Sequence, residues 1–77
     1  MQGRNHLQLA IAANVRAELA RRAMTQGQAC KALGISRTAM GDRLRGTTSI
    51  SAAELQQLAD FLGVPITALY QPEAVVA

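Results

Sequence analysis

Side chains that can bind an anion or a nucleic-acid base are concentrated between residues 36 and 48. Arg37, Arg43 and Arg45 lie there beside several hydroxyl groups and one carboxylate, that of Asp42. An arginine guanidinium donates two parallel hydrogen bonds to a phosphate, or to the O6 and N7 atoms of guanine. A threonine such as Thr38 can contact a phosphate or the methyl group of thymine. This set predicts binding to a polyanion, and the surrounding sequence must supply the elements that position it.

The charges are divided unevenly along the chain. All eight basic residues lie in the first 45 positions beside only Glu18 and Asp42, which gives this part a net charge of +6. From residue 46 onward the chain has three acidic and no basic residues, a net charge of −3. If the fold keeps the two parts separate, the basic side has the electrostatic footprint expected for binding a polyanion. The alternative is an ordinary solvated surface.

A short helix is predicted just before the basic segment. Thr25 and Gln28 have the spacing of a capping box, in which each side chain bonds to the other residue's backbone N–H. Gly34 then stands where a helix C-terminus needs a left-handed residue, a conformation that glycine adopts without a Cβ penalty. The single cysteine, Cys30, lies inside this helix, where we expect it to be a small buried side chain without a redox role.

The basic segment itself is predicted to be a second helix, over residues 37–45. Ser36 can cap its start. Met40 and Leu44 are four positions apart and therefore share one apolar face. Two short helices that are joined by a turn at Gly34 cross steeply, which is the helix-turn-helix arrangement.

A longer helix is predicted before this motif, over residues 7–22, after a frayed polar start that ends near His6. Asn5 is a candidate cap for it, and an earlier or a later start is left open. We place Asn14 on its solvent-exposed surface. Its apolar residues recur at every fourth position, as a buried helical stripe requires. They are Leu7, Ile11, Val15 and Leu19.

Two more helices are predicted after the motif. Ser51 and Glu54 form a second capping box, which opens a helix over residues 52–62. A last short helix begins at Val64 and Pro65, since proline suits the first turn of a helix. Tyr70 is expected to face the core. The fold class is therefore all-α, a compact bundle of five helices.

Length and composition predict one small domain, residues 1–72, followed by a short tail, residues 73–77. The aromatic residues are few, so the core must consist of aliphatic side chains and alanines. We find no apolar run long enough to span a membrane and no signal peptide. One cysteine cannot form an internal disulfide, and no Cys/His cluster offers a metal site. We therefore expect a cytoplasmic protein without metal or cofactor.

The segment from residue 25 to residue 46 resembles the helix-turn-helix of the lambda-repressor-like (XRE-type) family of phage repressors, Cro proteins and bacterial regulators. The likeness extends over about residues 11–70. The matching features are the Thr25-Gln26 opening, the small Ala29-Cys30 pair, the Leu33-Gly34-Ile35-Ser36 turn and the Arg45-Gly46 end. The resemblance implies the lambda-repressor-like five-helix fold and binding to double-stranded DNA.

By this resemblance, the helix over residues 37–45 enters the major groove. The residues then expected to read bases are Ser36, Arg37, Thr38, Gly41 and Asp42. The residues expected to contact phosphates are Thr25, Gln26, Gln28, Arg43, Arg45, Thr47 and Thr48. Arg37 is the strongest candidate for a guanine contact, and Gly41 keeps the helix thin near the bases. Asp42 either accepts from a cytosine amino group, pairs with Arg37 or an adjacent arginine, or faces solvent; we favour the pair.

The sequence departs from the family pattern at two linked places. Many members have an arginine where Leu19 stands and a glutamate where Leu44 stands, and these form an ion pair across two helices. Here both positions are apolar and are expected to lie in the core. The family also has an apolar residue where Arg43 stands, so a small rotation of the helix could present Arg43 to DNA.

The expected function is a sequence-specific, double-stranded DNA-binding transcription regulator, a repressor of the phage immunity or Cro type. Its partner would be a two-fold operator or a half-site, bound by a monomer or weak homodimer that is dimeric on DNA. It would act in a bacterial host cell, associated with the nucleoid. The alternatives are the antitoxin of a toxin–antitoxin pair and a protein-interaction module that does not bind DNA. An enzyme is not expected, because no catalytic constellation is present.

Overall fold

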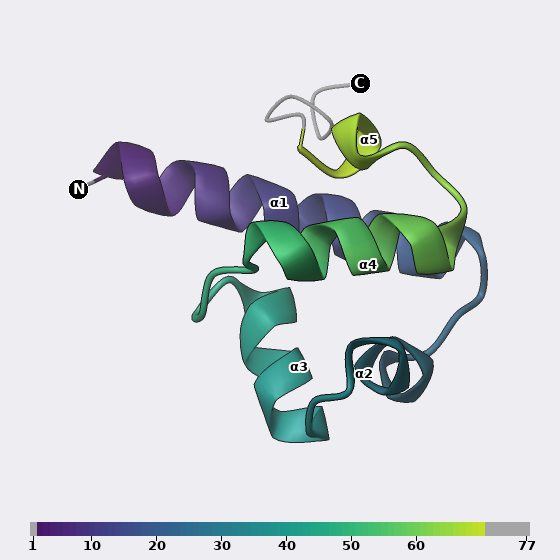
Figure 1. Cartoon of the computed structure of the whole chain (residues 1–77). Helices are drawn as coiled ribbons and strands as arrows, with labels where there is room; N and C mark the ends of the chain where they lie inside the picture. The colour runs from purple at the N-terminus through teal and green to yellow at the C-terminus, as the bar shows by residue number, and fades with distance from the viewer. Residues whose placement is uncertain (1, 71–77) are drawn as a thin grey trace.

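The computed structural model describes the backbone of residues 2–70 and the side chains of residues 6–70. This part of the chain is all-helical. Its elements are α1 (Gln2–Arg21), α2 (Gln26–Leu33), α3 (Arg37–Arg45), α4 (Ala52–Leu62) and α5 (Ile66–Tyr70). α1 and α4 lie side by side, with α5 on one side of them and α2 and α3 on the other (Figure 1). The five-helix, all-α prediction is confirmed, while the predicted tail lies outside the described residues.

Side-chain caps fix where the helices begin. The capping boxes of Thr25 with Gln28 and of Ser51 with Glu54 are both present. Ser36 caps α3, its Oγ accepting a hydrogen bond of 3.1 Å from the backbone N–H of Ala39. Each cap satisfies a backbone donor that has no partner within its own helix. These starts agree with the sequence predictions.

Three helices end on glycine, and one does not. The residues that follow α2, α3 and α4 are glycines with φ between 70° and 81°. After α1 the left-handed residue is Ala23, with φ 54°. The turn closes through a 2.9 Å hydrogen bond from the Met24 N–H to the Leu19 carbonyl. Because an alanine carries a Cβ, this helix end contains backbone strain that the glycine ends avoid.

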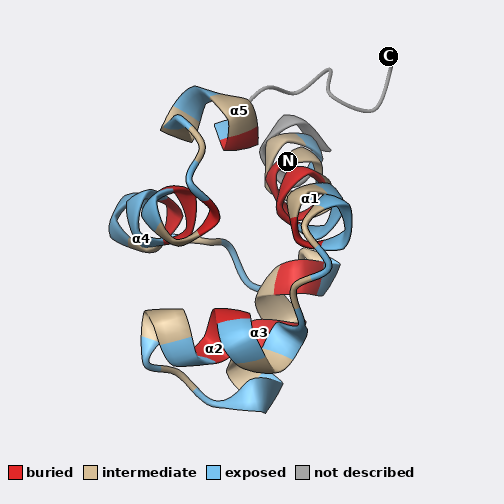
Figure 2. Ribbon diagram, turned by 90° about the vertical axis from the view of Figure 1, so that its right-hand side faces the viewer, coloured by how far each residue is buried: buried red, intermediate tan, exposed pale blue. Residues whose placement is uncertain are grey.

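The core lies between the helices, takes residues from all five of them, and is aliphatic, as predicted (Figure 2). Leu19 and Leu44 both belong to it, with exposed fractions of 5% and 8%. Its buried apolar residues are Ile11, Ala12, Val15, Leu19, Ala29, Cys30, Met40, Leu44, Leu55, Leu58, Ala59, Leu62 and Leu69. One polar side chain is buried among them: Asn14 donates a 2.9 Å hydrogen bond from Nδ2 to the Leu69 carbonyl. The surface position predicted for Asn14 is therefore wrong, because this bond across α1 and α5 compensates its burial.

The predicted boundaries and burial differ from the structure at both ends. α1 begins at Gln2, five residues before the predicted start. Polar residues such as glutamine and arginine are good helix formers, so a polar start need not be frayed. α5 begins at Ile66, after Pro65. Tyr70 is 53% exposed and does not face the core, because α5 is short and turns its one buried residue, Leu69, inward.

Candidate nucleic-acid interface

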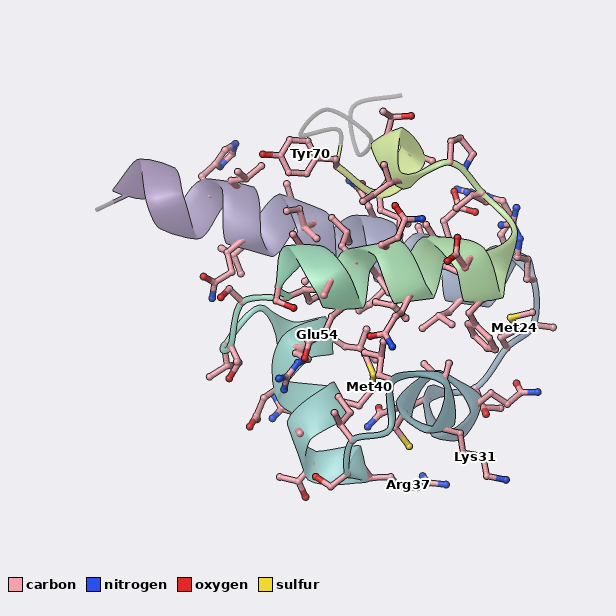
Figure 3. The ribbon with its side chains drawn as sticks, in the orientation of Figure 1. Met24, Lys31, Arg37, Met40, Glu54 and Tyr70 are labelled. Atoms are coloured by element: carbon pink, nitrogen blue, oxygen red, sulfur yellow. The ribbon has the colours of Figure 1, made fainter. Side chains whose placement is uncertain are left out.

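α3 is buried along one face and exposed at its start. Met40 is fully buried, and Leu44 follows it one turn later on the same face. Ser36, Arg37 and Thr38 are exposed at the other side and at the N-terminal end. In Figure 3, Met40 points toward the other helices while Arg37 lies at the edge farthest from α1. The start of α3 is therefore free to approach a ligand, and the apolar face fixes the helix to the domain.

A hydrogen bond from α2 supports the start of α3. The side-chain amide of Gln26 donates from Nε2 to the Arg37 carbonyl over 3.0 Å. The same Nε2 lies 3.3 Å from the place a Cβ would take on Gly41, and the Arg45 guanidinium lies 3.2 Å from it. Gly41 is therefore buried beneath two side chains. Gln26 and Arg45 fill the space that the missing side chain leaves, and the expected place of Gly41 near the bases stays a prediction.

Arg37 lies against α2 at Gly27. Its Nη2 is 3.0 Å from the place a Cβ would take on Gly27, so only glycine leaves this room without moving the guanidinium. Arg37 and Lys31 line one open hollow of about 330 Å³. Both lie at the outer edge of the motif (Figure 3). The other lining residues are Thr25, Gly27, Gln28 and Cys30.

Three of the seven Arg and Lys side chains within residues 6–70 have no acidic partner. Within residues 6–70, Arg16, Lys31 and Arg37 form no ion pair. Arg45 pairs with Asp42 over 2.5 Å, so Asp42 is paired within the protein, with Arg45 and not with Arg37. Both of these side chains are more than a third exposed, so water and salt screen this pair strongly.

The Arg43 side chain is mostly buried and is bound by Glu54 of α4. Its Nε and Nη2 each lie 3.0 Å from a different carboxylate oxygen of Glu54, at the start of α4, and its Nη1 donates to the Ala39 carbonyl over 3.1 Å. Both side chains of the ion pair are less than one-fifth exposed. The hydrogen bonds from Arg43 lower the pKa of Glu54, although burial raises it. The structure therefore does not show the rotation that would present Arg43 to DNA, because the guanidinium of Arg43 is bound to the carboxylate of Glu54.

Two polar side chains of α1 bind the end of α3, and this role was not predicted for either of them. Gln8 donates from Nε2 to the Gly46 carbonyl over 2.6 Å, and Arg16 donates to the Leu44 carbonyl. Carbonyls at a helix C-terminus lack helical partners and carry partial negative charge, which favours such donors. Gln8 and Arg16 are eight residues apart and therefore lie on one face of α1. That spacing is the signal from which their shared role could have been inferred.

The side chains expected at the phosphates lie on both sides of α3. Thr25 and Gln28 are exposed and bonded to each other in the capping box at the start of α2. Thr47 and Thr48 are exposed after the end of α3, where their backbone N–H groups bind the Asp42 carbonyl at 2.9 and 3.3 Å. The structure therefore provides polar groups at the start of α2 and just beyond the end of α3.

The sequence matches the helix-turn-helix family of the XRE, lambda-repressor-like type over residues 15–69, more than half of the chain. The chain belongs to this family. XRE-type helix-turn-helix domains are DNA-binding regulators, so double-stranded DNA is the partner that membership implies. No curated protein and no solved structure gave a significant match.

No group of three His, Cys, Asp or Glu side chains that could hold a metal ion occurs among the described residues. None of the described helices is long and apolar enough to cross a membrane. The polar surface around α3 is therefore the candidate site that the family membership and the geometry share.

Proposed function

We propose that this chain is a sequence-specific repressor of the phage immunity or Cro type, which occupies an operator and blocks polymerase. The observation that carries the proposal is the exposed start of α3, with an unpaired Arg37 on a helix whose other end is anchored. A helix of this size fits the major groove, where arginine recognises guanine. The proposal places the protein in the cytoplasm of a bacterial host, associated with the nucleoid.

The proposed contacts follow the positions of the side chains around α3. Ser36, Arg37, Thr38 and Asp42 face the bases, with the Ser36 hydroxyl also serving as the helix cap. Phosphates are contacted on the two sides of α3 and hold the register. The phosphate set is Thr25, Gln26, Gln28, Arg45, Thr47 and Thr48.

We propose further that the operator has two-fold symmetry and that the chain is a monomer or weak homodimer which pairs on DNA. One motif of this size covers only part of a turn of the groove, so two half-sites are needed for a long operator. Sedimentation of the free protein at nanomolar concentration tests this. A tight dimer would contradict it.

The test of function begins with selection of bound duplexes from a random DNA pool. Arg37→Ala should then weaken the selected duplex by ~1–3 kcal/mol and relax preference at one base position. Arg45→Ala should weaken selected and scrambled duplexes about equally and lower the salt slope by about one unit. Arg21→Ala on α1, an exposed arginine paired with Glu18, is the matched control and should change neither quantity.

The outcomes separate the possible roles of Arg37. If Arg37→Ala weakens both duplexes by the same factor, Arg37 contacts a phosphate and not a base. If the pool yields no preferred sequence at all, the repressor function itself is wrong.

A further inference from the structure

The ion pair between Arg43 and Glu54 joins the end of α3 to the start of α4. It uses both carboxylate oxygens of Glu54, and a third donor of the same guanidinium binds Ala39 within α3. Glu54 also accepts a 3.1 Å hydrogen bond from the Ser51 N–H, so it belongs to the cap that opens α4. Figure 3 shows Glu54 directed from α4 toward α3. One glutamate therefore connects the last turns of α3 with the first turn of α4.

This contact is directional, whereas the apolar contacts of α3 are not. Leu19 of α1 and Leu44 of α3 both lie in the apolar core. Burial of two leucines stabilises the fold, but the hydrophobic effect has no preferred angle. A planar guanidinium on a carboxylate, with two parallel bonds, has a fixed geometry. Gln8, Arg16 and Gln26 tie the backbone of α3 and its cap to α1 and α2, and the pair of Arg43 with Glu54 adds a bond of fixed geometry to α4.

The orientation of α3 decides where its exposed start lies. A nine-residue helix is ~13 Å long at ~1.5 Å per residue, so a tilt of about 10° at the anchored end moves the start by ~2 Å. Hydrogen bonds to base edges tolerate only about half an ångström of variation in length. Bonds to phosphates from flexible side chains tolerate more. A change in tilt therefore weakens recognition of one sequence more than it weakens binding to DNA in general.

We propose that Arg43 and Glu54 are positioning residues, a strut that makes operator selectivity depend on an ion pair that does not itself contact DNA. The proposal rests on the proposed function, since it assumes that α3 reads bases. It replaces the phosphate contact expected for Arg43 from the sequence.

The test compares Arg43→Met, Glu54→Gln and the double variant with the wild-type chain. Methionine retains most of the apolar stem of Arg43, and glutamine can still form the capping box with Ser51. Ser51→Ala is the matched control, because it removes the cap and keeps the ion pair. Each variant is first shown to be helical and folded by circular dichroism. Affinity is then measured for the duplex selected by the wild-type chain and for a scrambled duplex, over a series of salt concentrations.

Arg43→Met and Glu54→Gln should each lower the ratio of the two affinities by about tenfold, and the double variant should lower it no further, as expected for one coupled pair. The salt slope on the scrambled duplex should stay unchanged in Arg43→Met, since no phosphate contact is lost. Arg43→Lys, which keeps the charge but not the two parallel bonds, should restore part of the ratio. Ser51→Ala should leave the ratio at its wild-type value.

Two results would overturn the strut while leaving the proposed function intact. One is a salt slope lowered by about one unit in Arg43→Met, with equal weakening on both duplexes, which identifies a phosphate contact. The other is a wild-type ratio in both single variants. A wild-type chain that does not prefer its selected duplex would instead overturn the proposed function.

Discussion

The two ends of α3 are built differently. At the start, three consecutive residues are exposed, and one side-chain hydrogen bond, from Gln26, reaches the helix from α2. At the end, Gln8 and Arg16 of α1 donate hydrogen bonds to backbone carbonyls of α3 and its cap. Glu54 of α4 accepts hydrogen bonds from Arg43. The end is therefore joined to two long helices, while the start projects away from them.

Under the proposed function, this difference separates the residues that contact DNA from those that hold the helix. An exposed side chain at the start can be changed without loss of buried area, so substitutions there should affect binding more than stability. A substitution at the end removes packing or a bond to another helix, so it should affect stability first.

The largest effect is expected for Leu44→Ala. Leu44 lies in the core at the anchored end, and truncation of a buried leucine costs ~2–5 kcal/mol because it leaves a cavity. For a small domain whose total stability is ~5 kcal/mol, this change approaches complete unfolding. Urea denaturation measures it, with Arg37→Ala as the control that should change stability by no more than ~0.5 kcal/mol. A stable Leu44→Ala protein would show that the end of α3 is not anchored as described.

Gly46→Ala should be the next largest. Gly46 has φ 81°, which costs an L-residue ~1–2 kcal/mol, and a Cβ would lie 2.5 Å from Leu9 Cδ2. Displacing Leu9 adds about 1 kcal/mol, as overpacking does. Gly34→Ala at the end of α2 is the control, because its φ is similar but no atom lies within 4 Å of the added Cβ. Thermal unfolding of the two variants should therefore differ, and Leu9→Ala should abolish that difference.

The sequence predicted the motif well because its helix ends depend on local residues. The capping boxes of Thr25 and Ser51, and Gly34 at the end of α2, are determined within a few positions of the chain. The partners of Asn14 and Arg43 could not be predicted in this way. They lie 55 and 11 residues away, on helices whose packing angle no local pattern specifies.

The candidate site was predictable to a lesser extent. Exposure of Arg37 and Thr38 follows from their place outside the apolar stripe of α3. The burial of Gly41 does not, because it results from long side chains of Gln26 and Arg45 that fold over it. Flexible polar side chains have many rotamers, and the tertiary structure selects among them.

A smaller effect, of opposite sign, is expected for Ala23→Gly at the end of α1. Glycine would remove a left-handed strain of ~1–2 kcal/mol, and part of this gain, ~0.4–1 kcal/mol, is offset by the greater freedom of glycine in the unfolded chain. The net stabilisation of ~0.5–1 kcal/mol should raise the Tm by several degrees, at ~4–8 °C per kcal/mol. Ala20→Gly, within the helix, is the control and should lower the Tm. A decrease with Ala23→Gly would mean that this helix end is not strained.

The smallest effect is expected from acid, at the bond between α3 and α4. The hydrogen bonds from Arg43 hold the pKa of Glu54 below its ordinary value of 4.5, so the folded state binds this proton more weakly than the unfolded state. The resulting stabilisation is fully present above the unfolded pKa and is lost as the pH falls through the lower, folded pKa. Glu54→Gln cannot titrate and should be less stable than wild type by ~0.2–1 kcal/mol at pH 7. Urea denaturation between pH 7 and pH 3 should show the two proteins converging toward acid pH. A difference that stays constant or grows as the pH falls would show that the charge of Glu54 does not stabilise the anchored end of α3.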